Sequence, residues 1–239
     1  MKKILFLALT MISLNATEYF TKLEPYEKHI ISAEINGKVT YVNKTKEYSL
    51  VDKNTMVLKL DTKDEKIQLE ALESSLLLQK DIVKIKEQNY QNKAKVKQLS
   101  NYDKNQEKLA LIEAKQSLEN IKRDIKTQKR NIEKKEFYVS NLYIDEILVS
   151  KDEYVSLGTN LYSLYDFSKL KLEVFVRDQD IEGLNSKQIY IDGQKSDFKI
   201  EKISQVRDEK RVSTYKVVLS KVNSEKDIHF GKIVKVEFR

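Results

Sequence analysis

The segment that most restricts the fold of this chain is residues 63–136, which contain no glycine and no proline. The segment is rich in Lys, Glu, Gln and Leu, a composition typical of long exposed helices. Apolar residues in it recur at heptad intervals, which predicts that two helices pair along a narrow seam. The heptad rows are Leu69, Leu76, Val83 and Tyr90; Ala71, Leu78 and Ile85; and Leu111, Leu118, Ile125 and Ile132, with Ala114 and Ile121 at the second heptad position.

The heptad pattern is interrupted at residues 99–103, where Ser100 or Asn101 can act as the N-cap of a second helix. The simplest arrangement is an antiparallel hairpin with its tip near residues 97–103. Each arm of about 35 residues would extend about 50 Å, because an α-helix rises about 1.5 Å per residue.

β-Structure is expected on both sides of the hairpin. Apolar and polar residues alternate within residues 26–61, and they alternate strictly through residues 170–176. Turns are expected at Asn36-Gly37, Lys53-Asn54 and Asp192-Gly193, because Gly and Asn tolerate positive φ and Asp-Gly is a hairpin sequence. The predicted fold class is α+β, mainly β, with a long antiparallel α-helical coiled-coil hairpin inserted.

The two segments that flank the hairpin resemble each other. Residues 51–60 and 155–164 both begin with Val, continue through a turn residue and Thr, and end with Leu at the same spacing. An internal repeat that is divided by a coiled coil predicts a single β-module built from two halves.

The N-terminus has the pattern of an export signal. Lys2 and Lys3 precede an apolar run from Ile4 to Leu14, and Ala16 is a small residue at the expected cleavage position. The alternative is a retained membrane anchor, but the run is about half of the roughly 20 residues that span a bilayer. We therefore expect residues 1–16 to be removed and the protein to work outside the cytoplasm, without nucleic-acid partners.

The sequence offers no candidates for catalysis. The absence of cysteine excludes disulfides, Cys-ligated metals, a thiol nucleophile and a lipid-anchored lipoprotein. His29 and His229 lack the spacing of metal ligands and are interpreted as ordinary strand residues. No catalytic Ser/His/Asp arrangement or Gly-rich phosphate loop is present, so we expect no enzyme activity and no cofactor.

The order of these parts resembles membrane fusion proteins of the HlyD type, in which two lipoyl-like half-motifs flank a helical hairpin and a small β-barrel follows. The match depends on half-motif positions and on a late barrel turn. These residues are Gly37, Val39, Val51, Asn54 and Leu60 in the first half, Val155, Gly158 and Leu164 in the second, and Gly231 in the turn. The chain departs from the pattern where Asn54, Leu142 and Asp152 occupy places usually held by glycine.

The resemblance implies a domain arrangement for the mature chain. Residues 17–34 would supply strands that join the barrel, residues 35–62 and 137–165 the two lipoyl-like halves, residues 63–136 the hairpin, and residues 166–239 the β-barrel. Lys63 is interpreted as a lysine of the first helical turn and not as the modified lysine of a true lipoyl domain, whose motif is missing here.

The resemblance also implies a function. Such a protein would be a non-catalytic periplasmic adaptor, associated with the inner membrane through protein partners, which couples an inner-membrane transporter to an outer-membrane efflux channel. The cleaved signal favours a transporter of the resistance–nodulation–division type, and self-association into a hexameric ring is expected. The alternatives are a lipoyl- or biotinyl-type carrier domain of an enzyme complex, and a plain exported coiled-coil scaffold protein.

The hairpin tip is the predicted contact with the channel, through Leu99, Ser100, Asn101 and Tyr102. Tyr is a favoured interface residue because it covers a large area at low entropic cost. The alternative is that Leu99 and Tyr102 cap the seam from inside the hairpin. The excess of Lys and Arg on the hairpin is either a solvated surface or a charged surface complementary to a neighbouring protomer or to the channel.

Overall fold

The computed structural model describes residues 17–224 and 228–239, and it divides into two compact units. The first unit contains the chain up to His29 together with Tyr165–Arg239, and the second is Ile30–Leu164. The expected export signal, residues 1–16, lies outside the described residues. The predicted α+β class is confirmed, with a pair of antiparallel helices joined to β-sheets. In the described ranges, no helix is both long enough and apolar enough to cross a membrane.

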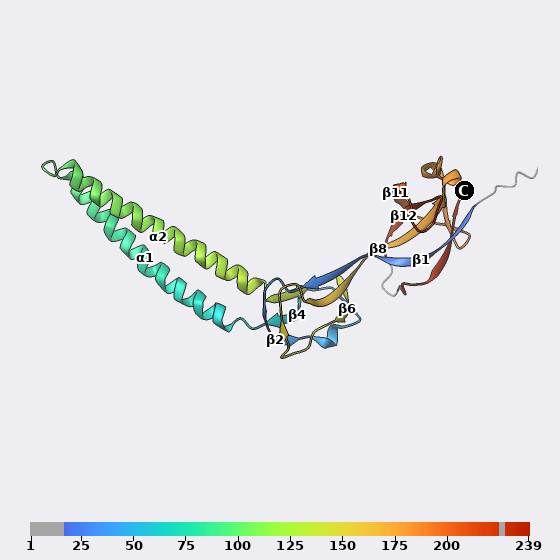
Figure 1. Cartoon of the computed structure of the whole chain (residues 1–239), viewed down its shortest axis with the longest axis horizontal. Helices are drawn as coiled ribbons and strands as arrows, with labels where there is room; N and C mark the ends of the chain where they lie inside the picture. Colours follow the sequence, from blue (N-terminus) through green and yellow to red (C-terminus); the bar gives the residue numbers. More distant parts are fainter. Residues whose placement is uncertain (1–16, 225–227) are drawn as a thin grey trace, which may run out of the picture. The chain divides into compact units, whose positions relative to one another are not determined.

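Two helices of equal length form the hairpin in the second unit, α1 (Lys63–Lys95) and α2 (Asn101–Glu133) (Figure 1). They pack against each other along a seam of buried and half-buried apolar residues, as the heptad rows predicted. The seam contains Leu69, Leu76, Val83 and Tyr90 of α1 and Leu111, Ala114, Leu118, Ile121, Ile125 and Ile132 of α2.

The other heptad row of α1 does not lie in this seam. Ala71, Leu78 and Ile85 are exposed, and the second seam row is Leu72, Gln79 and Lys86. The reason is geometric: two rows that share a helix face are three or four residues apart, whereas Ala71 is only two residues after Leu69. The amide Nε2 of Gln79 donates a hydrogen bond to the Ala114 carbonyl at 2.9 Å, which satisfies a polar group in the seam.

Ion pairs flank the seam. Lys115 lies 3.1 Å from Glu87, Lys129 lies 3.2 Å from Glu73, and Lys93 pairs with Glu107. Such pairs beside an apolar seam select one alignment of the two helices.

The β-structure of the second unit interlocks the two halves of the repeat. One sheet has the order β5-β4-β2-β7, and β3 pairs with β6, which pairs with β8. The strands are β2 (Gly37–Val42), β3 (Ser49–Val51), β4 (Thr55–Leu60), β5 (Glu136–Val139), β6 (Leu142–Ile147), β7 (Tyr154–Val155) and β8 (Asn160–Arg177), with a short 3-10 helix at Lys44–Lys46. Each half therefore gives its short strand to the other half, since β3 pairs with β6 and β7 pairs with β2.

The hairpin leaves and re-enters this module between adjacent strands. β4 pairs antiparallel with β5, with Lys59 opposite Glu136. The backbone N–H of Leu60 donates to the Lys135 carbonyl at 2.9 Å, and the Lys135 ammonium pairs with Glu65. The two ends of the insertion are thus held side by side by the β-module itself.

The first unit is built on a strand path with the order β10-β9-β13-β1-β8-β12-β11. Its other elements are β1 (Glu18–Ser32), β9 (Ile189–Ile191), β10 (Gln194–Lys195), β11 (Lys199–Arg207), β12 (Thr214–Val222), β13 (Ile233–Phe238), α3 (Asp178–Ile181) and a 3-10 turn at Leu184–Ser186. The strictly alternating residues 170–176 place Leu172, Val174 and Val176 in its core. Asp192 and Gly193, both at positive φ, form the turn between β9 and β10, as the Asp-Gly sequence predicted.

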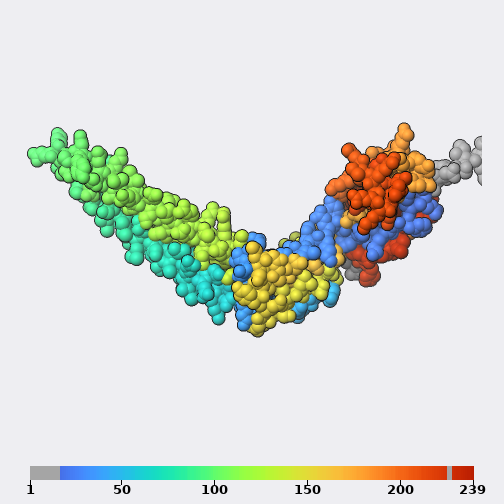
Figure 2. All heavy atoms as spheres, viewed as in Figure 1, coloured from blue at the N-terminus to red at the C-terminus, as the bar shows by residue number. Residues whose placement is uncertain are grey.

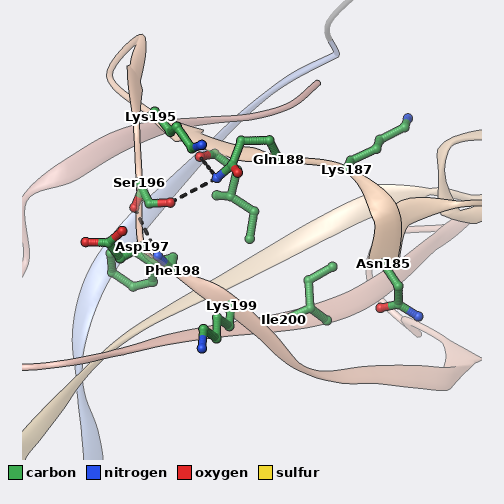
Figure 3. Close-up of a pocket in the computed structure, with 10 residues that line it drawn as sticks. Asn185, Lys187, Gln188, Lys195, Ser196, Asp197, Phe198, Lys199 and Ile200 are labelled. Carbon is green, nitrogen blue, oxygen red and sulfur yellow. Dashed lines mark hydrogen bonds between the residues drawn. The ribbon is translucent and has the colours of Figure 1, made fainter.

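The two ends of this path meet at a pocket of about 520 Å³ (Figure 3). Ile189 of β9 and Phe198, just before β11, line the pocket and belong to one buried core. Gln188 Nε2 donates to the Ser196 carbonyl at 3.1 Å across it. Both ends of the sheet therefore cover a single core, as a small barrel requires.

Replacing residues 64–133 with a short Gly-Ser linker should leave the second unit folded. The β4–β5 pairing closes the gap left by the hairpin, and the short strands exchanged between the halves are untouched. Circular dichroism should show loss of most helical signal with retention of a cooperative β-sheet transition. If the β-sheet transition disappears together with the helices, the interlocked halves are not the source of stability in this unit.

Substituting Glu237 should destabilise the first unit in a pH-dependent way. Its side chain is 3% exposed and contacts Lys235 at 2.7 Å, and Arg239 Nε donates to it at 2.8 Å. Hydrogen bonds from Lys235 and then from Arg239 lower the pKa of this carboxyl below 4.5. The stabilisation is therefore present above about pH 4.5 and is lost as the pH falls through the folded-state pKa.

The Tm of Glu237→Gln should accordingly lie below that of the wild type at pH 7, and the difference should shrink as the pH is lowered past 4.5. Glu18→Gln serves as the control, because Glu18 pairs with the same lysine but its side chain is 51% exposed. Equal Tm values for wild type and Glu237→Gln at pH 7 would contradict this role of Glu237.

Candidate functional site

The half-motif residues are structural. Val39, Val51, Leu60, Val155 and Leu164 are each at most 4% exposed and belong to one core of the second unit. They hold the two halves together and present no surface to a partner.

Gly37 is required for close packing and not for a turn. It begins β2 opposite Val155, and a Cβ added to it would lie 3.2 Å from Leu60 Cβ. The predicted positive-φ turn at Asn36-Gly37 is therefore wrong, because Gly37 does not have positive φ. Gly158 does, with φ +85°, and its N–H donates to the Ala33 carbonyl at 2.8 Å.

The departures from the glycine pattern differ in their consequences. Asp152 adopts φ 72°, a left-handed conformation that Asp tolerates better than most residues, and pairs with Lys38 at 2.7 Å. Asn54 lies exposed in the turn between β3 and β4 and does not have positive φ. The repeat thus keeps its spacing but not its backbone conformation at Asn54 and Gly158.

Gly231 forms the turn that precedes β13, with φ +95°. Its N–H donates to the Leu23 carbonyl at 2.8 Å, and the Leu23 N–H donates to Lys232 at 2.9 Å. This turn attaches β13 to β1 within the first unit.

The hairpin tip lies between the end of α1 at Lys95 and the start of α2 at Asn101. Ser100 is the N-cap of α2, since its Oγ accepts a hydrogen bond from the Asp103 N–H at 3.1 Å. The Ser100 hydroxyl also donates to Asp103 Oδ2 at 2.6 Å. The carboxylate of Asp103 lies in the first helical turn, where the helix dipole favours negative charge.

The tip presents apolar surface to solvent. Tyr102 is 71% exposed, Ser100 and Asn101 are exposed, and Leu99 is half-buried. The exposure of Tyr102 contradicts the interpretation that it caps the seam. Val96 is also exposed, at 47%, and the sequence interpretation missed it. It follows Tyr90 by six residues and so lies off the seven-residue row, which was the available signal.

An ion pair joins the two helices just below the tip. A hydrogen bond from Lys93 lowers the pKa of the Glu107 carboxyl, so this pair stays charged at neutral pH. The tip is therefore a short connection whose two flanking turns are fixed, by the Ser100 cap on one side and by Lys93–Glu107 across the seam.

The remaining candidates do not form a chemical site. His29 lies in β1 with Nε2 3.6 Å from a Glu27 oxygen, whereas His229 lies between β12 and β13 and not in a strand. Lys63 is the exposed first residue of α1. Across the part of the chain that the structure describes, no cluster of three or more His, Cys, Asp or Glu side chains is placed to hold a metal ion.

Comparison with known proteins identifies the fold. No family model and no curated protein matches the sequence. The membrane fusion protein Spr0693 from Streptococcus pneumoniae R6 matches with a TM-score of 0.70 at 10% identity, over 93% of this chain and 98% of that one. A MacA-MexA chimeric protein with the Pseudomonas aeruginosa MexA α-hairpin domain gives 0.68 at 14% identity, over 94% and 81%. MacA from Actinobacillus actinomycetemcomitans gives 0.55 at 16% identity, over 94% and 78%.

The chain therefore has the membrane fusion protein fold, as the order of its parts predicted. At these identities the likeness is one of architecture. The role of individual residues must be argued from this chain itself.

Ser100→Ala should destabilise the hairpin by about 1 kcal/mol, because it removes the side-chain acceptor for the Asp103 N–H. Urea unfolding followed by helical circular dichroism measures this difference. Ser75→Ala is the matched control, since the Ser75 hydroxyl only donates to the Ala71 carbonyl within α1 and Ala is the better helix former. Equal losses in the two variants would show that Ser100 does not act as a cap.

Proposed function

We propose that this chain is the adaptor subunit of a tripartite efflux or secretion system, coupling an inner-membrane transporter to an outer-membrane channel without catalysis. The observation that carries the proposal is a slender hairpin, based on an interlocked β-module, whose tip exposes an aromatic and an aliphatic side chain. Tyr102 and Val96 are apolar where a plain coiled coil needs only polar residues.

The hairpin is suited to act as a spacer. Each helix has 33 residues, which corresponds to about 50 Å at the rise of an α-helix. Inter-helix ion pairs and the buried Gln79 fix the alignment of the two helices. A spacer with one fixed alignment holds its tip at one distance from its base.

The tip is proposed as the contact with the channel, through Leu99, Ser100, Asn101 and Tyr102, together with Val96. A half-buried Leu99 beside exposed Tyr102 gives a small apolar surface with polar neighbours, which is the composition of a protein–protein contact. Tyr at the centre of such a contact commonly contributes about 2 kcal/mol or more.

The remaining partners follow from the same proposal. The β-barrel of the first unit would meet the inner-membrane transporter, of the resistance–nodulation–division type, and the protein would assemble as a hexameric ring in the periplasm. Cleavage after Ala16 would release it there. The β-modules then serve assembly and spacing, so neither a cofactor nor an enzymatic residue is needed.

The tip contact can be tested by placing a photo-crosslinking amino acid at Val96 and irradiating cells that contain the complete transport system. We expect an adduct with an outer-membrane channel protein, identified by mass spectrometry. Adding Tyr102→Asp should abolish the adduct, because it puts a charge into an apolar contact, while the melting of the helices should not change.

Tyr48→Asp provides the matched control. Tyr48 is 67% exposed but distant in sequence from the tip, and its φ of 57° is a conformation that Asp tolerates. An adduct that survives Tyr102→Asp, or that Tyr48→Asp removes equally, would argue against channel docking at the tip.

A further inference from the structure

We propose that the exposed apolar row of α1 binds α2 of a neighbouring copy of this chain, with the two hairpins side by side and pointing in the same direction. This inference rests on the proposed function and identifies the hairpin surface through which the copies would meet. We call this surface the outer row, and it consists of Ile67, Ala71, Leu78, Ile82 and Ile85.

The outer row has the spacing of a second seam. Its residues are separated by three, four or seven positions, so they lie on one side of α1, away from the seam with α2. Ile67 is 66% exposed, Leu78 68% and Ile85 55%. In the space-filling view, the hairpin projects from the β-module with no other element packed along it on the face shown (Figure 2). A helix with apolar rows on two sides has room for two helical neighbours, and this chain supplies one.

The charges next to the outer row indicate what that neighbour is. Beside the inner seam, basic and acidic side chains pair between the helices. Beside the outer row, α1 carries Glu70 and Asp81, whereas the outward surface of α2 carries Lys126 and Arg130. None of these four side chains makes an ion pair with any described residue of the chain. An acidic border on α1 and a basic border on α2 are complementary between copies.

The positions along the hairpin agree with this pairing. The contacts of Glu87 with Lys115 and Glu73 with Lys129 show which residues of α1 and α2 lie at the same height. By that alignment Ile85 is level with Ile112, which is 51% exposed on α2. When a second copy lies alongside in the same direction, apolar residues therefore meet apolar residues.

The acidic border is treated in the same way. Glu70 of one copy lies level with Lys126 and Arg130 of its neighbour, by the same alignment of α1 and α2. Opposite charges then face each other at the height where the outer row has its basal residues.

The same charges disfavour a pairing of two outer rows. Antiparallel α1 helices would bring Glu70 of one copy close to Asp81 of the other, and like charges across a helical contact are destabilising. A contact between unlike surfaces, α1 to α2, leaves a free α1 at one end and a free α2 at the other. Such a contact closes into a ring when the rotation between copies allows it.

The test uses the absence of cysteine in the chain. One variant carries Ile85→Cys and a second, with a size tag, carries Ile112→Cys, so that no cross-link can form within one molecule. The two are mixed and oxidised, and the disulfide-linked dimers are separated by mass. A disulfide needs Cα atoms within about 7 Å, so we expect mainly the mixed Ile85→Cys/Ile112→Cys dimer. Ile82→Cys with Gln116→Cys is a second pair at equal height, and both positions are exposed.

Leu77→Cys is the matched control, because Leu77 is 63% exposed on α1 but lies outside the outer row. It should give little mixed dimer with Ile112→Cys. Adding Glu70→Lys should lower the yield of the expected dimer, and Arg130→Glu on the other partner should restore it. Retention of helical circular dichroism confirms that each variant is folded.

Three results would overturn the proposal: no mixed dimer from either pair of folded variants, a preferred dimer of Ile85→Cys with itself, or an equal yield from Leu77→Cys. The disulfide test detects contact between copies, whereas the photo-crosslink at Val96 detects contact with the channel. Each can fail while the other succeeds, so failure of this inference is distinguishable from failure of the adaptor proposal.

Discussion

The exchange of short strands between the two halves of the second unit is the constraint on which the rest of this structure depends. β3 completes the second half and β7 completes the first, so neither half can bury its own apolar residues alone. Val51 and Val155 end these exchanged strands and are both buried. The hairpin can extend far from the module because its two ends are fixed by β4 and β5, in the middle of the interlocked sheets.

Much of the fold could be predicted from the sequence, because two of its signals are local. The heptad row of α2 and the row that begins at Leu69 identified the seam, and the absence of Gly and Pro identified the extent of the helices. The split repeat identified the β-module, since a Val and a Leu at fixed spacing mark the same strand turn twice. Asp192-Gly193 predicted its hairpin because the turn requires positive φ at both residues.

The remaining features depend on contacts between residues distant in the sequence. Gly37 was taken as a turn residue, but its need for a missing side chain arises from Leu60 on the neighbouring strand. The row that contains Leu78 was assigned to the seam because heptad spacing alone does not say which side of a helix faces its partner. At the tip, the exposure of Tyr102 depends on how α2 begins, and the sequence left Ser100 and Asn101 as equal candidates for the cap.

The position of the hairpin between paired strands also has a consequence for folding. Leu60 and Lys135 bond through their backbones although most of the helical insertion separates them. Closing a flexible loop of that length costs on the order of 4 kcal/mol in chain entropy. A helical hairpin forms from local contacts, and once formed it brings both strands together before they pair. The long insertion then shortens the search for the native sheet, and the order of events would be helices first and interlocked strands second.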